Sequence, residues 1–145
     1  MCVIVDANVA SIFFCAQHAD YQDLIQAVFC GKCCLVYGGQ LKREYSVMKK
    51  VMSIVLTLDR AGRARAVPDD PVDNQTATLV RNKACSSDDE HVIALASVSH
   101  SRLLCTDDSA LEQDFTTAAL LSSPRGNIYK RPAHRPLIRK HCRAC

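Results

Sequence analysis

The chain alternates short apolar runs with longer stretches of helical periodicity, and this alternation constrains its fold more than any other feature. A short apolar run bounded by turn residues is typical of a buried strand. When helices follow strands one by one, the strands form a parallel sheet that has helices on both faces. We therefore expect an α/β fold, a three-layer α/β/α sandwich around a central parallel sheet of four to five strands. The predicted strands are residues 3–5, 33–37, 64–67, 103–105 and 127–129, and the predicted helices are residues 7–16, 20–29, 41–56, 72–82 and 110–121.

A further helix is predicted by a start signal in the loop before it. Ser87 and Glu90 have the spacing of a capping box, in which a serine hydroxyl and a carboxylate bind the first free N–H groups of a helix. The apolar residues from Val92 to Ala96 follow with helical spacing. We expect Ser87 to cap this helix.

The length of 145 residues suits one ordinary domain and leaves little room for two. No apolar run approaches the roughly 20 residues that a membrane-spanning helix needs. The N-terminus has no basic region, and Asp6 falls where the apolar part of a secretion signal would lie. We therefore expect a cytoplasmic protein that makes no membrane contact.

The net charge of +3 hides an asymmetry between the two ends of the chain. Residues 1–114 hold all 15 acidic residues and 11 of the 18 Lys and Arg, which gives −4. Residues 115–145 hold the other seven basic residues and no acid, which gives +7. We expect a folded body over residues 1–124 and a basic C-terminal tail over residues 125–145.

Nine cysteines are present, an odd number without a secretion signal, so we expect free thiols rather than disulfides. Two pairs, Cys30/Cys33 and Cys142/Cys145, have a C-x-x-C spacing that can chelate zinc, with His134 and His141 close to the second pair. Cysteines inside strand-like runs usually act as small core residues. That second interpretation is the one we favour.

Carboxylates occur where the predicted strands end and where helices begin after loops. Asp6 follows the first strand, and Asp107 and Asp108 follow the strand at 103–105. Glu44 and the pair Asp88–Asp89 lie near helix starts, at the same edge of a right-handed α/β sheet. Up to six carboxylates from four segments therefore share one rim. Each acid also has an ordinary role in a turn or at a helix dipole.

A shared rim of acids has a consequence that the single residues do not have. Two carboxylates about 5 Å apart repel by roughly 3 kcal/mol at an effective dielectric constant of 20. Such a cluster raises its pKa values or recruits cations. Because only oxygen ligands are expected, the cations are hard divalent ions, Mg²⁺ or Mn²⁺, in one or two positions. Two ions held by carboxylates are a known arrangement for phosphodiester hydrolysis.

Four segments together resemble the PIN domain, a family of metal-dependent ribonucleases that includes the VapC-type toxins of toxin–antitoxin pairs. They are VIVDANV at 3–9, GGQLKREY at 38–45, DDEHVIALA at 88–96 and LLCTDD at 103–108. The resemblance covers roughly residues 2–121, in the order and spacing of the family. It implies a PIN-like fold, cleavage of single-stranded RNA by a metal-activated water, an antitoxin partner and a homodimer.

The resemblance also assigns roles to individual residues. The catalytic, metal-binding acids are Asp6, Glu44, Asp89 and Asp108, and Asp88 and Asp107 are alternative or supporting ligands. Asn8 and Thr106 are polar candidates beside the metal ligands, whereas Ala7 stands where the family often has a hydroxyl.

The basic tail is a candidate RNA-binding segment, with a flexible solubilising tail as the alternative. Its cations would contact phosphates in a salt-dependent way, and Tyr129 would stack on a base. His91 is expected to be an exposed helix residue. The predicted RNA-binding residues are Arg125, Lys130, Arg131, Arg135, Arg139 and Lys140, with Arg143 also in the tail.

Two other functions stay open at this point. A response-regulator receiver domain would use Asp6 and a phosphoacceptor at Asp59, with Tyr129 to Pro132 as its Lys-Pro element, but Ala7 replaces the second acid such a domain needs. A PIN-like domain without catalysis would serve as an RNA-binding or complex-forming module. Metal binding separates this module from the nuclease.

Overall fold

A computed structural model describes residues 2–142 of the chain. It is an α/β protein with a five-stranded, all-parallel sheet and eight α-helices among these residues. Short π-helical and 3₁₀ segments occur at Ser11–Cys15, Ala19–Tyr21 and Pro132–His134. The strands are β1 (Cys2–Val5), β2 (Cys34–Gly38), β3 (Ala64–Val67), β4 (Leu103–Cys105) and β5 (Asn127–Ile128). The helices are α1 (Ala7–Ala10), α2 (Gln22–Phe29), α3 (Gly39–Val47), α4 (Lys49–Arg60), α5 (Asp69–Arg81), α6 (Glu90–Ser99), α7 (Ser109–Phe115) and α8 (Pro136–His141).

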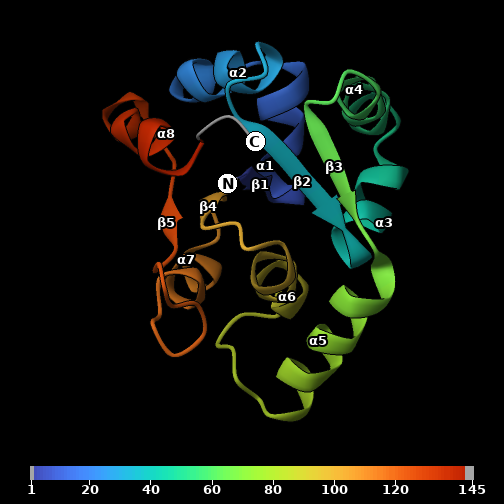
Figure 1. Ribbon diagram of the computed structural model, residues 1–145, viewed down its shortest axis with the longest axis vertical. Coiled ribbons are helices and arrows are strands. Elements are labelled where there is room, and N and C mark those ends of the chain that lie inside the picture. The colour runs from blue at the N-terminus through green and yellow to red at the C-terminus, as the bar shows by residue number, and fades with distance from the viewer. Residues whose placement is uncertain (1, 143–145) are drawn as a thin grey trace.

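The sheet has the strand order β3-β2-β1-β4-β5. Helices α1, α2 and α4 lie on one side of it, and α5, α6 and α7 lie on the other (Figure 1). The predicted three-layer α/β/α architecture is therefore confirmed. After β1, the chain adds β2 and β3 on one side of this strand, and it later adds β4 and β5 on the other side. The strand order therefore reverses between β1 and β4. Open α/β sheets form their binding crevice at such a point.

The two central strands are buried on both faces. All residues of β1 and β4 have less than a tenth of their surface exposed, which explains why both appear in the sequence as unbroken apolar runs. Their pairing aligns Val5 with Cys105. The residues directly after them, Asp6 and Thr106, are therefore neighbours at the carboxyl edge of the sheet.

Three predicted helices are shorter than expected or interrupted. The stretch 7–16 is α-helical over Ala7–Ala10 and continues as the π-helical segment Ser11–Cys15. The stretch 41–56 is divided at Met48, whose φ of −100° and ψ of 85° are not helical, so that α3 and α4 run in different directions. Apolar periodicity continues through this break and therefore gives no sign of it. The stretch 110–121 ends its helix at Phe115, where the hydroxyls of Thr116 and Thr117 bond to carbonyls of the preceding turn.

The predicted capping box is wrong. Helix α6 begins at Glu90 with Asp89 as its N-cap, and no side chain caps it. The Ser87 hydroxyl lies one residue too early. It accepts a hydrogen bond from the Asp89 N–H at 3.3 Å and donates one to Asp114 at 2.7 Å. The Ser87–Glu90 motif therefore predicts the start of a helix correctly, but the Ser87 side chain stabilises the loop before the helix and does not cap it.

The expectation of free thiols is wrong for two cysteines, because Cys33 and Cys142 form a disulfide. It links the start of β2 to the end of α8, two parts of the chain separated by 109 residues. Each predicted zinc pair thereby loses a thiolate, and Cys145 lies outside the described residues. The core interpretation holds for Cys105, which is fully buried inside β4.

The basic C-terminal segment is folded as far as Cys142. Asn127–Ile128 pair with β4 as the edge strand that the sequence predicts, and α8 lies on the same side of the molecule as α2 (Figure 1). A flexible tail is therefore wrong for residues 125–142. Arg143 lies outside the described residues. Among residues 2–142, no helix combines the length and the apolar character that crossing a bilayer requires.

Candidate active site at the carboxyl edge of the sheet

The site is centred on Asp6 and Thr106, at the reversal point between β1 and β4. The backbone N–H of Asp6 donates to the carbonyl of Cys105 at 2.9 Å, which extends the ladder by one residue. The Thr106 hydroxyl donates to Asp6 Oδ2 at 2.8 Å. Asp6 is only 4% exposed and Thr106 is fully buried. Strand pairing thus fixes a buried carboxylate in one orientation.

Asp108 joins this pair through Thr106. The Asp108 N–H donates to the Thr106 hydroxyl at 3.1 Å, and Asp108 Oδ1 accepts the N–H of Leu111 as the N-cap of α7. Asn8 lies on the other side, with its side-chain amide 3.5 Å from the same hydroxyl. The two polar residues proposed from the resemblance, Asn8 and Thr106, therefore both lie beside Asp6.

Glu44 approaches from α3, and two neighbours fix the position of that helix. The Tyr45 side chain is fully buried, and its hydroxyl donates to the carbonyl of Val5, the last residue of β1. Gly39 begins α3 with φ of +54° and donates its N–H to Asp69 at 3.0 Å. A Cβ at Gly39 would lie 2.7 Å from a methyl group of Val72, so the close packing of α3 on α5 requires glycine here.

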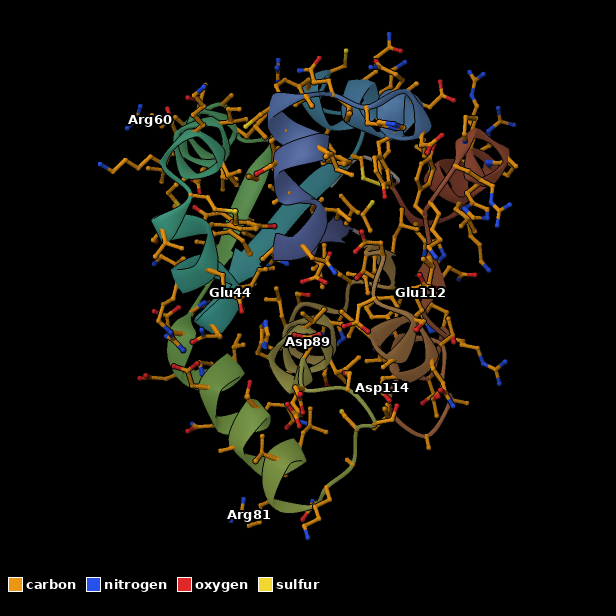
Figure 2. The ribbon with its side chains drawn as sticks, turned by 180° about the vertical axis from the view of Figure 1, so that it is seen from behind. Glu44, Arg60, Arg81, Asp89, Glu112 and Asp114 are labelled. Atoms are coloured by element: carbon orange, nitrogen blue, oxygen red, sulfur yellow. A yellow bond between two sulfur atoms is a disulfide. The ribbon has the colours of Figure 1, made fainter. Side chains whose placement is uncertain are left out.

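Asp89 is positioned by a loop that Asp114 holds. The carboxylate of Asp114 accepts four hydrogen bonds, two backbone N–H bonds at 2.9 Å and two hydroxyl bonds at 2.7 Å, from Ser86 and Ser87. Burial raises the pKa of Asp114, but these bonds outweigh it and the net pKa is lowered. The loop then delivers Asp89 to the start of α6, opposite Glu44 on α3 (Figure 2). Sequence reasoning missed Asp114, because it lies 27 residues beyond Ser87.

The four acids interact electrostatically. The pKa of Asp6 is raised from its ordinary 3.8 to about 6. Burial is the main cause, and the negative charges of Asp89 and Glu44 act in the same direction, whereas the Thr106 hydrogen bond lowers the pKa. Burial also raises the pKa of Asp89, where Asp108 and Glu44 add repulsion and His91 opposes it. The structure therefore brings Asp6, Glu44, Asp89 and Asp108 into one acidic cluster.

Within each doubled pair of acids, one member faces the cluster and the other faces solvent. Asp89 and Asp108 are half-buried, whereas Asp88 and Asp107 are exposed. Asp107 instead interacts electrostatically with Tyr21, and Asp88 affects the cluster through Asp89. The inner members are therefore the stronger candidates for ligands.

His91 is buried, so its prediction as an exposed helix residue is wrong. The residue has 7% of its surface exposed, and Nε2 lies 3.4 Å from Glu44 Oε2. It is the second residue of α6 and lies next to the acids. The sequence around a single histidine in an apolar helix does not show whether its side chain is buried or exposed.

The acidic cluster is not arranged as a closed metal site. Within the described part of the chain, no three His, Cys, Asp or Glu side chains converge closely enough to hold an ion as they stand. The chemistry of the donors nevertheless suits a hard cation, since carboxylate and hydroxyl oxygens surround a buried Asp6 whose ionisation is unfavourable. A cation at this position would offset the repulsion among the acids.

The predicted RNA-binding residues are in different environments. Lys130 forms an ion pair with Glu112 of α7, and Tyr129 is fully buried, so base stacking by Tyr129 is ruled out. The remaining cations do not gather at the acidic cluster as one group: Arg135 and Arg139 line a cavity between α2 and α8. The other predicted residues, Arg125, Arg131 and Lys140, are exposed.

The receiver-domain alternative is contradicted by the place of its phosphoacceptor. Asp59 lies in α4 and not at a strand end, and it accepts a hydrogen bond from the Tyr37 hydroxyl at 2.6 Å. A receiver needs this aspartate at the same sheet edge as Asp6.

Comparisons of the chain with protein-family models, with curated proteins and with solved structures find no match. The geometry of the acidic cluster is therefore the main indication of function.

Proposed function

We propose that the protein is a Mg²⁺- or Mn²⁺-dependent endoribonuclease that hydrolyses phosphodiester bonds of single-stranded RNA. The observation that carries this proposal is the burial of Asp6 among three further carboxylates at the reversal point of the sheet. A structural role does not explain why four segments place acids together at unfavourable electrostatic energy. A cation-dependent function does explain it.

The residues that would hold the metal are Asp6, Glu44, Asp89 and Asp108. A bound divalent ion supplies an activated water and neutralises charge on the phosphate during phosphodiester hydrolysis. The chain itself supplies the fixed position of Asp6, because Thr106 holds one of its oxygens. Glu44 must turn from His91 toward the other acids, which a side chain on the surface of α3 can do.

The proposal includes partners that follow from the PIN resemblance. RNA is the substrate, an antitoxin protein and a second copy of the chain are the expected protein partners, and the cytoplasm is the expected compartment. The Cys33–Cys142 disulfide makes the last point testable, since reducing cytoplasm keeps most thiols free. Mass mapping of protein alkylated inside cells would show whether this pair is reduced there.

The test is cleavage of a single-stranded RNA by purified protein with Mn²⁺. We expect cleavage by the unmodified protein, and loss of at least about 100-fold in EDTA or in Asp6→Asn. The doubled acids provide a matched control: Asp108→Asn should abolish cleavage, whereas the exposed neighbour in Asp107→Asn should leave most of it. Equal cleavage in every lane would indicate a contaminating nuclease and would refute the proposal.

A second candidate is a PIN-like module that binds RNA without cutting it. The observation in its favour is that Glu44 is already engaged by His91 and that the acids do not converge as they stand. This module would bind RNA with no detectable uptake of Mn²⁺, and its RNA affinity would be the same in Asp6→Asn. The nuclease instead takes up Mn²⁺ and cleaves the bound RNA, and Asp6→Asn removes the cleavage.

A further inference from the structure

A cavity of about 650 Å³ lies between α2 and α8, away from the acidic cluster. Its volume falls in the range of roughly 300–1,000 Å³ that small-molecule sites occupy. It lies beside the start of β2, where Cys33 is bonded to Cys142, whereas Glu44 belongs to the helix that follows the end of β2. The five residues of β2 span about 16 Å. This α2–α8 cavity is thus a separate feature of the molecule.

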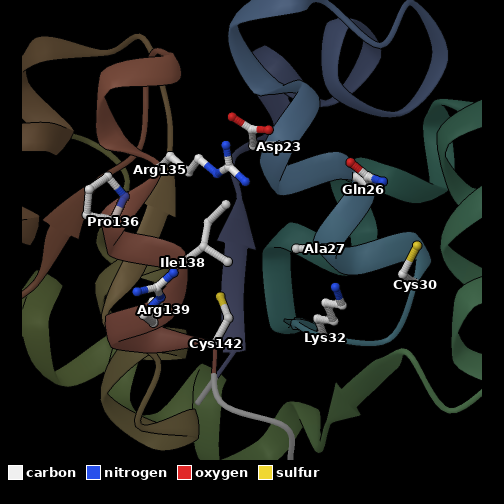
Figure 3. Close-up of a pocket in the computed structure, with 10 residues that line it drawn as sticks. All are labelled: Asp23, Gln26, Ala27, Cys30, Lys32, Arg135, Pro136, Ile138, Arg139 and Cys142. Carbon is white, nitrogen blue, oxygen red and sulfur yellow. The ribbon is translucent and has the colours of Figure 1, made fainter.

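Positive charge lines both walls of the α2–α8 cavity. Arg135 and Arg139 come from the α8 wall and Lys32 from the turn after α2, as Figure 3 shows. Within residues 2–142, none of the three forms an ion pair with a carboxylate. One carboxylate, Asp23, also lines the cavity. A concave surface with unpaired cations concentrates small anions.

Two sulfur atoms belong to the same lining. Cys142 contributes through its disulfide with Cys33, and Cys30 contributes an exposed free thiol from the end of α2 (Figure 3). Cys15 is also a free, exposed cysteine, but it lies outside this lining. Among residues 2–142, Cys15 and Cys30 are therefore the exposed free thiols, and Cys30 lines a charged cavity.

These groups together match one class of small molecule. Two carboxylates would be held by Lys32, Arg135 and Arg139 through charge-assisted hydrogen bonds, and an ammonium group would be held by Asp23. A thiol in the same molecule would meet Cys30. We propose that Cys30 is a modification site that forms a mixed disulfide with a short peptide thiol bearing two carboxylates and one ammonium group. Glutathione has this set of groups.

The reaction is a thiol–disulfide exchange with the oxidised, dimeric form of the peptide thiol. The Cys30 thiolate, whose proton has passed to solvent, attacks one sulfur of the ligand disulfide. A bond forms between Cys30 Sγ and that sulfur while the ligand S–S bond breaks. The second ligand half leaves as a thiolate and takes up a proton. Cys30 is oxidised, the leaving half is reduced, and the number of disulfide bonds is unchanged.

The test compares Cys30 with Cys15 in the same molecules by time-resolved mass mapping. With oxidised glutathione, we expect Cys30 to react at least about tenfold faster than Cys15. With the neutral 2-hydroxyethyl disulfide, we expect the two rates to agree within about threefold, because both thiols are exposed. Raising the salt concentration should reduce the preference for Cys30 with oxidised glutathione and leave the rates with the neutral disulfide unchanged. The peptide that holds Cys145 is scored separately.

A pair of double variants separates the cavity from general surface charge. With oxidised glutathione, Arg135→Gln with Arg139→Gln should lower the ratio of the Cys30 rate to the Cys15 rate to the value found with the neutral disulfide. Arg60→Gln with Arg81→Gln removes two exposed helix cations elsewhere and should leave it unchanged (Figure 2). Equal rates at both cysteines with oxidised glutathione would overturn the proposal. An equal preference with the neutral disulfide, or its persistence at high salt, would also overturn it.

Discussion

Replacing the buried aspartate at the centre of the acidic cluster should stabilise the metal-free protein at neutral and alkaline pH. Folding raises the pKa of Asp6 from 3.8 to about 6, so the folded protein holds this proton more tightly than the unfolded chain does. Stability is therefore lost as the pH rises from about 4 to above 6 and Asp6 ionises. A shift of about two pKa units corresponds to about 3 kcal/mol of unfolding free energy.

The assay is urea unfolding of the unmodified protein and Asp6→Asn in EDTA, at pH 3.5 and at pH 8. Any effect of the substitution that does not depend on pH is the same at both values and cancels in the comparison. We expect the variant to gain about 3 kcal/mol relative to the unmodified protein between pH 3.5 and pH 8. Asp107→Asn, at an exposed acid nearby, should change by less than about 0.5 kcal/mol.

A flat difference across this pH range would refute the reasoning, because it would mean that ionising Asp6 carries no penalty in the folded state. A gain in stability of the variant that occurs only at low pH would contradict the predicted sign of the pH dependence. The expected result would show instead that stability is sacrificed at this position, as is common where a residue serves function.

Three other substitutions test how the site is supported. Asp114→Asn should lower the unfolding free energy by about 1–3 kcal/mol at pH 7, because an amide nitrogen cannot accept the hydrogen bonds from Ser87. The pKa of Asp114 is lowered in the folded protein, so the stability difference between the two proteins should vanish as the pH falls below 3.8 and Asp114 is protonated. Calorimetry measures this difference. Gly39→Ala should destabilise by more than about 1 kcal/mol in urea unfolding, because its methyl group meets Val72 at a positive φ, and an unchanged midpoint would contradict this. Tyr129→Phe should either stabilise the protein or change its unfolding free energy by less than about 1 kcal/mol, because the buried Tyr129 hydroxyl has no hydrogen-bond partner. Thermal unfolding measures this, and a large loss of stability would mean that the hydroxyl does have a partner.

The parts of the site that follow strands were predictable from the sequence. Asp6 and Asp108 come after apolar runs, and parallel strands bring their carboxyl ends to one edge, so sequence position alone places them together. Glu44 required the further assumption that the next helix starts at that edge. Gly38 and Gly39 mark this start, and the structure places Glu44 beside the other acids.

The remaining features depend on contacts that no local pattern reports. Asp114 binds Ser86 and Ser87 across a loop, a helix and a strand, and the Cys33–Cys142 disulfide joins the start of β2 to α8. The break at Met48 leaves the apolar period intact on both sides. Such features are decided by packing between distant segments, which only the folded chain brings together.

The central claim, that the acidic cluster is a site for hard divalent cations, is tested most directly by Mn²⁺ titration followed by electron paramagnetic resonance. At pH 8 we expect the unmodified protein and Asp107→Asn to bind one or two Mn²⁺ ions. Asp89→Asn should weaken this binding by at least about tenfold, since it removes a ligand of a carboxylate site. Failure of the unmodified protein to take up millimolar Mn²⁺, or equal uptake by Asp89→Asn, would contradict the account.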